Sequence, residues 1–298
     1  DWYTRTTKDL LMSKQLNSIS GFSSLLTNVG QMRNTGVELE VRSNNIKTKD
    51  FSWTTAFNLS HNKNKILKLA DLPWFVDGRY VRKEGYPFNT IYLREYAGVG
   101  PETGSALYYD NQQDENGNYT KNKVTDPGQA SPIPLKDITP TISGGFMNTF
   151  NYKFIDLSFN LSYSFGGYSY DNASYILQDD GYSVISNKST EQRRRWQKPG
   201  DITDVPRFVY GNKKGGNYNS SRAIHSTDHI RLKSLILGLN APKAWLQKLG
   251  IGNARIYFSG TNLLTWAAYD QYDPEISGVV GFYTPPLKTY AFGLELKF

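Results

Sequence analysis

The last ten residues, 289–298, alternate between apolar and polar positions. The apolar positions are Tyr290, Phe292, Leu294, Leu296 and Phe298. A period of two places the two sets on opposite faces of a β-strand. Ten residues at about 3.4 Å each, tilted by roughly 40°, span about 25 Å, the height of the apolar band of a membrane β-barrel. A soluble β-sandwich strand could alternate in the same way, but it rarely ends the chain on an exposed Phe. The pattern therefore favours a membrane-spanning strand, and we interpret Phe298 as an assembly signal.

The same alternation recurs along the chain and predicts further membrane strands. The predicted strands are Trp2–Met12, Gly36–Arg42, Phe51–Ser60, Thr141–Tyr152, Ile155–Phe165, His229–Leu239 and Ala254–Leu263. On their apolar sides and on that of the last strand, the positions predicted to face lipid are Phe57, Leu157, Phe159, Leu161, Phe292, Leu294 and Leu296. The fold class predicted from these strands is all-β, a transmembrane antiparallel β-barrel.

The connections between these strands alternate in length. Short joins are predicted near 45–50, 153–154 and 242–251, and a helical turn at Ala244–Leu249 could plug the barrel rim. Long loops are predicted at 13–30, 65–139, 166–228 and 264–288. Outer-membrane barrels combine short periplasmic turns with long extracellular loops. The chain therefore contributes eight membrane strands, or ten if 65–139 adds a whole hairpin; Ile91–Ala97 and Ala106–Tyr109 could pair within that segment.

The bulk composition is compatible with this architecture. Hydrophobic residues make up 38% of the chain, the mean hydropathy is −0.54, and no apolar run reaches the ~18 residues of a membrane helix. Aromatic residues, at 14%, suit the girdles at the two membrane interfaces. The absence of Cys fits export through an oxidising periplasm. The net charge of +7 is scattered, so we expect no nucleic-acid groove.

A series of short motifs carries a family resemblance. They include Asn34–Glu40, Phe51–Asn58, Gly98–Ser105, Trp196–Asp201, Asp204–Arg207, Ile230–Ser234, Ser259–Leu264, Tyr272–Ile276 and Lys288–Leu294. In this order and spacing, the chain resembles the SusC/RagA family of TonB-dependent outer-membrane transporters. The resemblance covers the whole chain.

The resemblance implies a larger assembly than this chain alone. It implies a 22-stranded barrel with an N-terminal plug, of which residues 1–298 would be the C-terminal portion without the plug. The first residues, Asp1–Arg5, read as the inside of a strand, so we expect a piece of a longer protein. The family imports oligosaccharides or peptides across the bacterial outer membrane. Its partners would be a SusD-like surface lipoprotein, TonB through the missing part, and outer-membrane lipid.

Features of enzymes and metal sites are weak in the sequence. His61, His225 and His229 lack metal-ligand spacing, and neither a Cys nucleophile nor a Gly-x-Ser-x-Gly motif is present. Asp179 and Asp180 are adjacent on an Asp-Asp-Gly turn and are expected to be solvated. We therefore predict no catalytic residues, no metal and no cofactor.

Several loop residues are candidates for contact with substrate or with a lid. Tyrosines and a tryptophan are predicted in loops at the external mouth, where exposed aromatics suit stacking on sugars or lid contact, although an interface girdle explains some of them. These are Tyr168, Tyr170, Tyr182, Trp266, Tyr269 and Tyr272. Arg195 and Trp196 could clamp a ligand, and Asp273 and Glu275 could contact substrate or lid. For both pairs we favour the alternative that they anchor their loops.

Two other functions stay open at this point. A passive porin or structural barrel would need no TonB coupling. A soluble β-sandwich adhesin or glycan-binding module would pair its apolar faces internally and would stay in solution without detergent.

Overall fold

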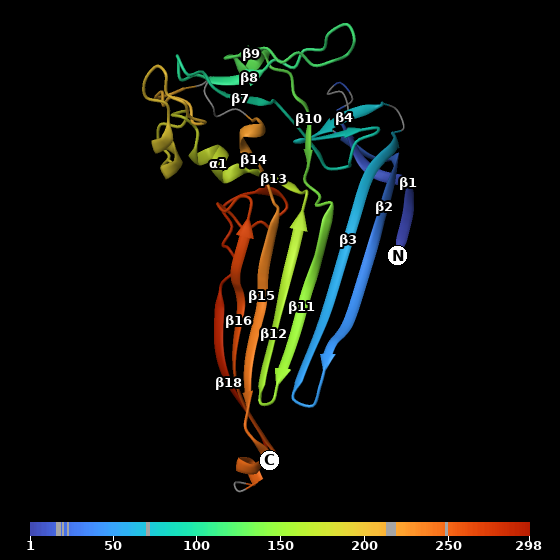
Figure 1. The fold of residues 1–298 in the computed structure, drawn as a ribbon. Coiled ribbons are helices and arrows are strands. Elements are labelled where there is room, and N and C mark those ends of the chain that lie inside the picture. Colours follow the sequence, from blue (N-terminus) through green and yellow to red (C-terminus); the bar gives the residue numbers. More distant parts are fainter. Residues whose placement is uncertain (16–18, 20, 23, 70–71, 213–218, 248–249) are drawn as a thin grey trace.

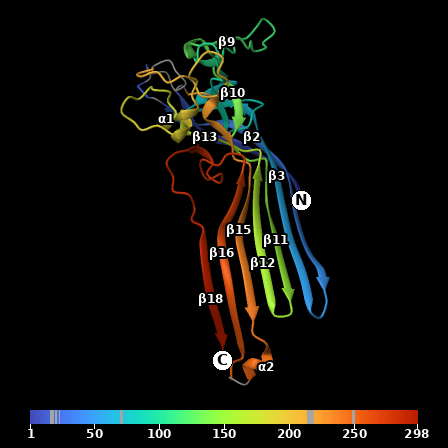
Figure 2. The ribbon, with the colours of Figure 1, turned by 60° about the vertical axis from the view of Figure 1, so that its left-hand side comes forward.

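The computed structural model describes the chain except for residues 16–18, 20, 23, 70–71, 213–218 and 248–249. Its main feature is an antiparallel eight-stranded sheet of order β1-β2-β3-β11-β12-β15-β16-β18 (Figures 1 and 2). The strands are β1 (Trp2–Gln15), β2 (Ser24–Lys47), β3 (Phe51–Leu69), β11 (Ile142–Tyr152), β12 (Ile155–Phe165), β15 (His229–Asn240), β16 (Asn253–Ala267) and β18 (Thr289–Lys297). The prediction of eight membrane strands therefore agrees with the strand count of this sheet.

One face of the large sheet is apolar across nearly all of its strands. Residues that are opposite each other in register point to the same side of a sheet. One such row, from β2 to β18, consists of Ile46, Trp53, Phe150, Leu157, Leu237, Phe258 and Phe292. We call this side the apolar face. The predicted residues Phe57, Phe159, Leu161, Leu294 and Leu296 lie on the same side.

The opposite side is polar, and we call it the polar face. One of its rows consists of Glu40, Asn58, Gly145, Ser162, Arg231 and Thr265. The apolar face is not covered by a second sheet among the described residues, and Phe292 on it is 82% exposed. A β-sandwich would bury these side chains, so the soluble sandwich alternative is wrong.

The remaining strands form three small sheets at one end of the large sheet, and we call this region the crown (Figure 1). The first has the order β10-β6-β5-β4, with β4 (Trp74–Asp77), β5 (Tyr80–Lys83), β6 (Thr90–Leu93) and β10 (Ile133–Asp137). The second contains β7 (Tyr96–Val99), β8 (Ala106–Tyr109) and β9 (Lys123–Val124), and the third contains β13 (Tyr168–Asp171), β14 (Ile224–Ser226) and β17 (Gly278–Val280). The crown thus collects the long connections at one end, and the tight turns lie at the other.

The helices are few and short. In the crown lie α1 (Asn172–Leu177) and the 3₁₀ turns η2 (Pro127–Gln129), η3 (Thr190–Arg194) and η4 (Ser221–Ala223). At the opposite end, α2 (Lys243–Leu246) accounts for the first part of the predicted helical turn, whose residues 248–249 lie outside the described residues (Figure 2). None of the described helices is long and apolar enough to cross a membrane.

The strands run further into the crown than the alternation of apolar residues indicates. β1 continues to Gln15 and β2 begins at Ser24, so most of the predicted loop 13–30 is a ladder. β3 continues to Leu69 and β16 to Ala267, which shortens the loops predicted from 65 and 264. These extensions mix polar and apolar residues and do not simply continue the alternation before them, so the sequence pattern does not show where the strands end.

Two predictions for the segment 65–139 are corrected. Its strands join the crown sheets and not the large sheet, so the ten-strand alternative is wrong. The partner of Ala106–Tyr109 is Tyr96–Val99, whereas Thr90–Leu93 pairs with β5 and β10. A break at Arg94 and Glu95 divides the predicted strand Ile91–Ala97 between two sheets, and a continuous β-rich sequence does not reveal it.

A hydrophobic core inside the crown holds two of its sheets together. Ile91 and Leu93 of β6 pack with Tyr170 of β13 and with Ala223, and Val279 of β17 packs against them. This core fixes β13 and β17 above the polar face of the large sheet.

Candidate functional site

The connection between β16 and β18, residues 268–288, folds back over the polar face, and we call it the strap. Its strand β17 pairs in parallel with β13, with Ser169 opposite Gly278 and Tyr170 opposite Val279. The strap is therefore attached to the crown by backbone hydrogen bonds. Two further attachments are made by side chains.

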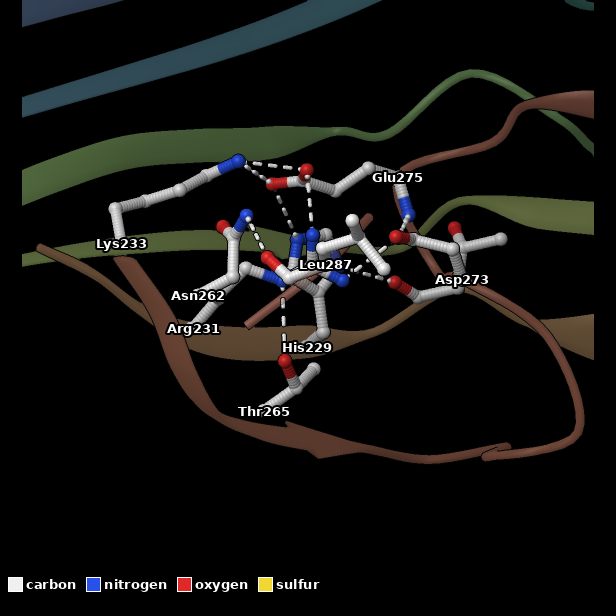
Figure 3. A network of polar contacts seen from close by, with 9 residues as sticks. His229, Arg231, Lys233, Asn262, Thr265, Asp273, Glu275 and Leu287 are labelled. Carbon is white, nitrogen blue, oxygen red and sulfur yellow. Dashed lines mark hydrogen bonds and ion pairs between the residues drawn. The ribbon is translucent and has the colours of Figure 1, made fainter. Parts of the chain in front are cut away.

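The first attachment is a buried cluster of charges on β15 (Figure 3). Arg231 donates from Nη2 to Asp273 Oδ1 at 2.7 Å and from Nη1 to Glu275 Oε2 at 2.8 Å. Its Nε donates to Thr265 Oγ1 at 3.1 Å. The side chains of Arg231 and Asp273 are each 4% exposed. Because the guanidinium is satisfied on all three nitrogens, it fixes the strap to the sheet.

Glu275 also lies close to Lys233 and His229 in the same cluster. Lys233 Nζ lies 2.6 Å from a carboxylate oxygen of Glu275, and His229 Nε2 lies 3.8 Å from Oε1 (Figure 3). Lys233 falls at a register shift of β15, between Leu232 and Ser234. The backbone N–H of Glu275 donates to Asp273 Oδ1 at 2.9 Å, which holds the Asp-Pro-Glu turn closed. Both acidic residues are therefore held by the large sheet.

The second attachment joins the strap to β13 and α1. Tyr269 donates to Asp171 Oδ2 at 3.0 Å, and its ring stacks on His225 with centroids 3.7 Å apart. The Tyr272 hydroxyl hydrogen-bonds to Ser169 Oγ. Asp171 also caps α1, because its Oδ1 accepts from Ser174 N at 2.9 Å.

Burial sets the protonation of these groups. It raises the pKa of Tyr272 to about 12 and raises that of Tyr269, so both phenols keep their protons at neutral pH. Burial lowers the pKa of His225, so the ring that stacks on Tyr269 is neutral at pH 7. The second attachment is therefore made of neutral rings and one carboxylate.

A cavity of about 580 Å³ lies between α1, the strap and the upper end of the polar face. Its polar lining includes Asp171, Gln178, Arg231, Asn262, Asp270, Gln271, Asp273 and Lys288. Phe282 and Tyr283 also line it, and they are 69% and 60% exposed. Exposed rings beside amides and carboxylates can stack on a ligand and hydrogen-bond it. We call this space the strap cavity.

The structure brings together only some of the residues singled out from the sequence. Tyr269, Tyr272, Asp273 and Glu275 lie in the strap, and of these Tyr272 and Asp273 line the strap cavity. Tyr170 is 1% exposed in the crown core and donates to Asn219 Oδ1 at 2.7 Å.

Four of the other candidates lie elsewhere in the crown. Tyr168 begins β13, and Lys136 Nζ is 5.0 Å from its ring centroid. Tyr182 is 51% exposed and does not line the cavity. Arg195 follows η3, and Trp196 donates from Nε1 to Pro101 O at 2.7 Å.

Trp196 joins two loops by close packing. A Cβ added to Gly104 would lie 2.3 Å from the Trp196 ring, and the backbone N–H of Trp196 donates to Val205 O at 3.0 Å. Gly104 has φ +67°, which also favours glycine. These contacts are those of a loop anchor.

The expected location of Trp266 is wrong. It lies within β16, opposite Ile230, on the apolar face and not in a mouth loop. The strand extends past the point where its apolar alternation fades, so Trp266 is a wall residue.

The expectation of a solvated Asp179–Asp180 turn is also wrong. Asp179 is 1% and Asp180 0% exposed. Lys188 Nζ lies 2.6 Å from Asp179 Oδ2, and Gln192 donates to Asp180 Oδ1 at 3.0 Å. Arg222 forms an ion pair with Asp180. Burial raises the pKa of Asp180, and the charge of Arg222 opposes that shift. The cation lies 42 residues away in sequence, so no local pattern could reveal it.

Sequence reasoning also missed Arg231, Phe282 and Tyr283. Phe282 and Tyr283 are followed by Thr284-Pro285-Pro286. Consecutive prolines restrict the backbone of a loop, so this sequence could have indicated that the two rings are held in place. Among the described residues, no group of three or more His, Cys, Asp or Glu could hold a metal ion.

Comparisons with known proteins place this geometry among large transporters. No family model matches the chain. TonB-dependent receptor P3 of Formosa agariphila is 33% identical over 330 residues, covering all of this chain and 32% of the receptor. TonB-dependent receptor SusC of Bacteroides thetaiotaomicron is 28% identical, covering all of this chain and 30% of SusC. The chain thus spans about a third of the length of the curated relatives it matches.

Solved structures agree on the fold. A structure of the RagAB peptide transporter matches all of this chain and 33% of its own, with TM-score 0.86 and 31% identity. The RagAB peptide importer in an "open-open" state matches with TM-score 0.84 and 29% identity, again over all of this chain and 32% of its own.

Proposed function

The chain belongs to the SusC/RagA family of TonB-dependent outer-membrane transporters, and from this premise we propose that the whole protein actively imports a nutrient across that membrane. The described residues contribute a section of the barrel wall and part of the mouth. We propose binding and gating roles for them and no bond-breaking chemistry.

The apolar face would contact the lipid. The proposed lipid contacts are Phe57, Leu157, Phe159, Leu161, Phe292, Leu294 and Leu296. The continuous apolar rows from β2 to β18 support this role. Exposing these side chains to water costs free energy, and contact with lipid hydrocarbon removes that cost. The polar face would then line the interior. Phe298 remains the proposed assembly signal.

We base on the strap cavity the proposal that this part of the barrel contacts the substrate. It lies at the crown end of the polar face, and it combines two exposed rings, Phe282 and Tyr283, with amide and carboxylate groups. Tyr272 and Asp273 would line the substrate path, held in place by Ser169 and Arg231. Both oligosaccharides and peptides present surfaces that such groups can bind.

A SusD-like surface lipoprotein is the proposed partner over the crown. Apolar side chains of the crown segment 176–210 are strongly exposed, with Ile185 at 94%, Ile202 at 97% and Tyr210 at 77%. Exposed apolar surface of this kind marks interaction sites. Tyr182 and the neighbours of Arg195 and Trp196 belong to the same region. TonB would act through a part of the protein outside this chain.

Growth on defined nutrients tests the import proposal. A strain that lacks the gene for the whole protein would receive either the wild-type gene or the variant Phe282→Ala/Tyr283→Ala. Each strain would be grown on single oligosaccharides and on tryptic casein peptides as sole carbon source. We expect at least one nutrient to require the wild-type gene, and the double variant to take it up roughly tenfold more slowly, since 1.4 kcal/mol of binding corresponds to a factor of ten.

The control is Trp245→Ala, which removes an exposed ring at the opposite end of the molecule. It should leave uptake unchanged. Uptake that continues after the tonB gene is deleted would contradict active import and would indicate a passive porin.

A further inference from the structure

The crown contains a second cavity of about 520 Å³ that shares no lining residue with the strap cavity. It lies between the sheet that contains β4, β5, β6 and β10 and the segment 111–119. Its lining residues are Trp74, Val81, Lys83, Tyr92, Asn111, Gln112, Gln113, Tyr119, Ser131, Pro132 and Pro134. We call it the crown cavity. The residues described as lining it all come from the segment 74–134.

Three aromatic rings line this cavity. Trp74 is 46% exposed, and its ring centroid is 6.0 Å from that of Tyr92 at an interplanar angle of 48°. Tyr119 is 37% exposed and is held by a β-bridge to Gln113. The pKa of Tyr92 is raised by burial first and by the charge of Tyr119 second. The cavity is therefore lined by a half-exposed indole and by two phenols.

The amides of the cavity are fixed before any ligand arrives. Gln112 donates from Nε2 to Gln129 O at 3.4 Å and to Ser131 Oγ at 3.3 Å. Asn111 is 1% exposed, and its Oδ1 accepts from Lys121 Nζ at 3.0 Å. Groups that are already ordered lose little conformational entropy when a ligand binds.

The charge of the lining is low. Lys83 is the one charged residue among the residues described as lining the cavity, and its Nζ lies 4.9 Å from the ring centroid of Tyr86. A cationic ligand would lose its hydration there without meeting a carboxylate. An anionic ligand would have to compete with the Tyr86 ring for the ammonium group of Lys83. A neutral ligand meets no such cost.

We propose that the crown cavity is a binding site for a neutral oligosaccharide. A sugar ring has an apolar C–H face, which matches the indole of Trp74, and a rim of hydroxyls, which matches the amides and phenols. The volume falls within the usual range for small-molecule sites of roughly 300–1,000 Å³. A peptide is the less suitable ligand, because its ammonium terminus and cationic side chains meet no carboxylate among the residues described as lining the cavity. This site is separate from the strap cavity and does not depend on transport.

Calorimetric titration of the whole protein in detergent tests the proposal. The protein would carry Phe282→Ala/Tyr283→Ala, so that binding at the strap cavity is weakened and failure of the import proposal stays distinguishable. The probes are maltohexaose, laminarihexaose, cellohexaose and xylohexaose, with penta-alanine as the peptide probe. We expect at least one oligosaccharide to bind, and Trp74→Ala to weaken that binding roughly tenfold or more.

Two further variants of the cavity show whether a loss of binding comes from the missing ring or from misfolding, and a third variant is the control. Trp74→Phe keeps an aromatic face and should retain most of the affinity, while Tyr119→Ala removes a half-exposed ring and should weaken binding. Trp245→Ala lies at the other end of the molecule and should have no effect. Absence of binding by all four oligosaccharides, binding that survives both Trp74→Ala and Tyr119→Ala, or Trp74-dependent binding of penta-alanine alone would each overturn the proposal.

Discussion

The charged residues of the strap show how position decides the role of a side chain. Asp273 and Glu275 lie in a predicted loop, and from the sequence they could either contact a ligand or anchor that loop. In the structure both accept hydrogen bonds from Arg231, and only Asp273 also lines the strap cavity. Removing one partner from a buried ion pair leaves an uncompensated charge, which costs far more than an exposed pair contributes.

Replacing Arg231 with Ala should release the strap. The change leaves Asp273, whose side chain is 4% exposed, without its guanidinium, and we expect a cost of about 3–5 kcal/mol to the closed strap. Hydrogen exchange of the whole protein in detergent measures this directly, as faster exchange at residues 268–288. Arg42→Ala is the matched control, because Arg42 also lies on a strand of the large sheet, but its side chain is 80% exposed. Equal protection of the strap in both variants would mean that Arg231 does not hold it.

At the scale of the element, apolar and polar side chains alternate along the strands of the large sheet except at register shifts such as that at Lys233. Pairs of tyrosine and glycine pack neighbouring strands together. Tyr163 lies opposite Gly144 and Tyr257 lies opposite Gly293, and in both pairs the tyrosine ring covers its glycine. A Cβ on Gly293 would lie 2.3 Å from the Tyr257 ring. Aromatic rings over glycines in this way support a strand position that lacks a side chain.

The alternation on β12 gives a paired test. Phe159→Arg places a charge on the apolar face and should cost roughly 2–4 kcal/mol if that position lies near the middle of the membrane. Ser158→Arg places the same charge one residue away on the polar face and should cost much less. The quantity to measure is the fraction of folded protein in the outer membrane, from the shift of the unheated protein on a gel. Similar losses for the two variants would sink the assignment of the faces.

The sequence predicts the elements better than it predicts the site, and the reason is physical. The alternation of apolar and polar residues is a local pattern, so the strands of the large sheet and the side chains on its apolar face could be predicted directly from the sequence. The strand extension Ser13–Gln15 opposite Ser24–Leu26 mixes polar and apolar residues and is formed by backbone pairing, which leaves no regular pattern in the local sequence.

The site depends on contacts between residues far apart in sequence. Arg231 is separated from Asp273 by 42 residues and Asp180 from Arg222 by the same number. For this reason the sequence wrongly predicted that Asp180 is solvated. Trp266 was wrongly predicted to lie in a loop, because the apolar alternation of β16 fades before the strand ends. Asp273 and Glu275 could be selected as a pair, but their partner on β15 could not.

At the scale of the whole molecule, the large sheet is an open section with β1 and β18 at its edges. In lipid, backbone N–H and C=O groups must be paired, so such edges require further strands. The relatives that match all of this chain are about three times as long, which supplies enough chain for a closed wall. The crown and the strap then lie at one end of that wall, and both cavities are lined by their residues.

Site-directed spin labelling tests the central claim most directly, that the apolar face meets lipid and the polar face meets the interior. This chain contains no Cys, so single labels can be placed on β12 and β18 of the whole protein in membranes. Labels at Phe159 and Leu294 should be reached by oxygen dissolved in the lipid and shielded from a water-soluble nickel chelate. Labels at Ser158 and Glu295 should lack that preference for oxygen. A reversed pattern, or no alternation between neighbouring positions, would contradict the assignment of this sheet as a membrane barrel wall.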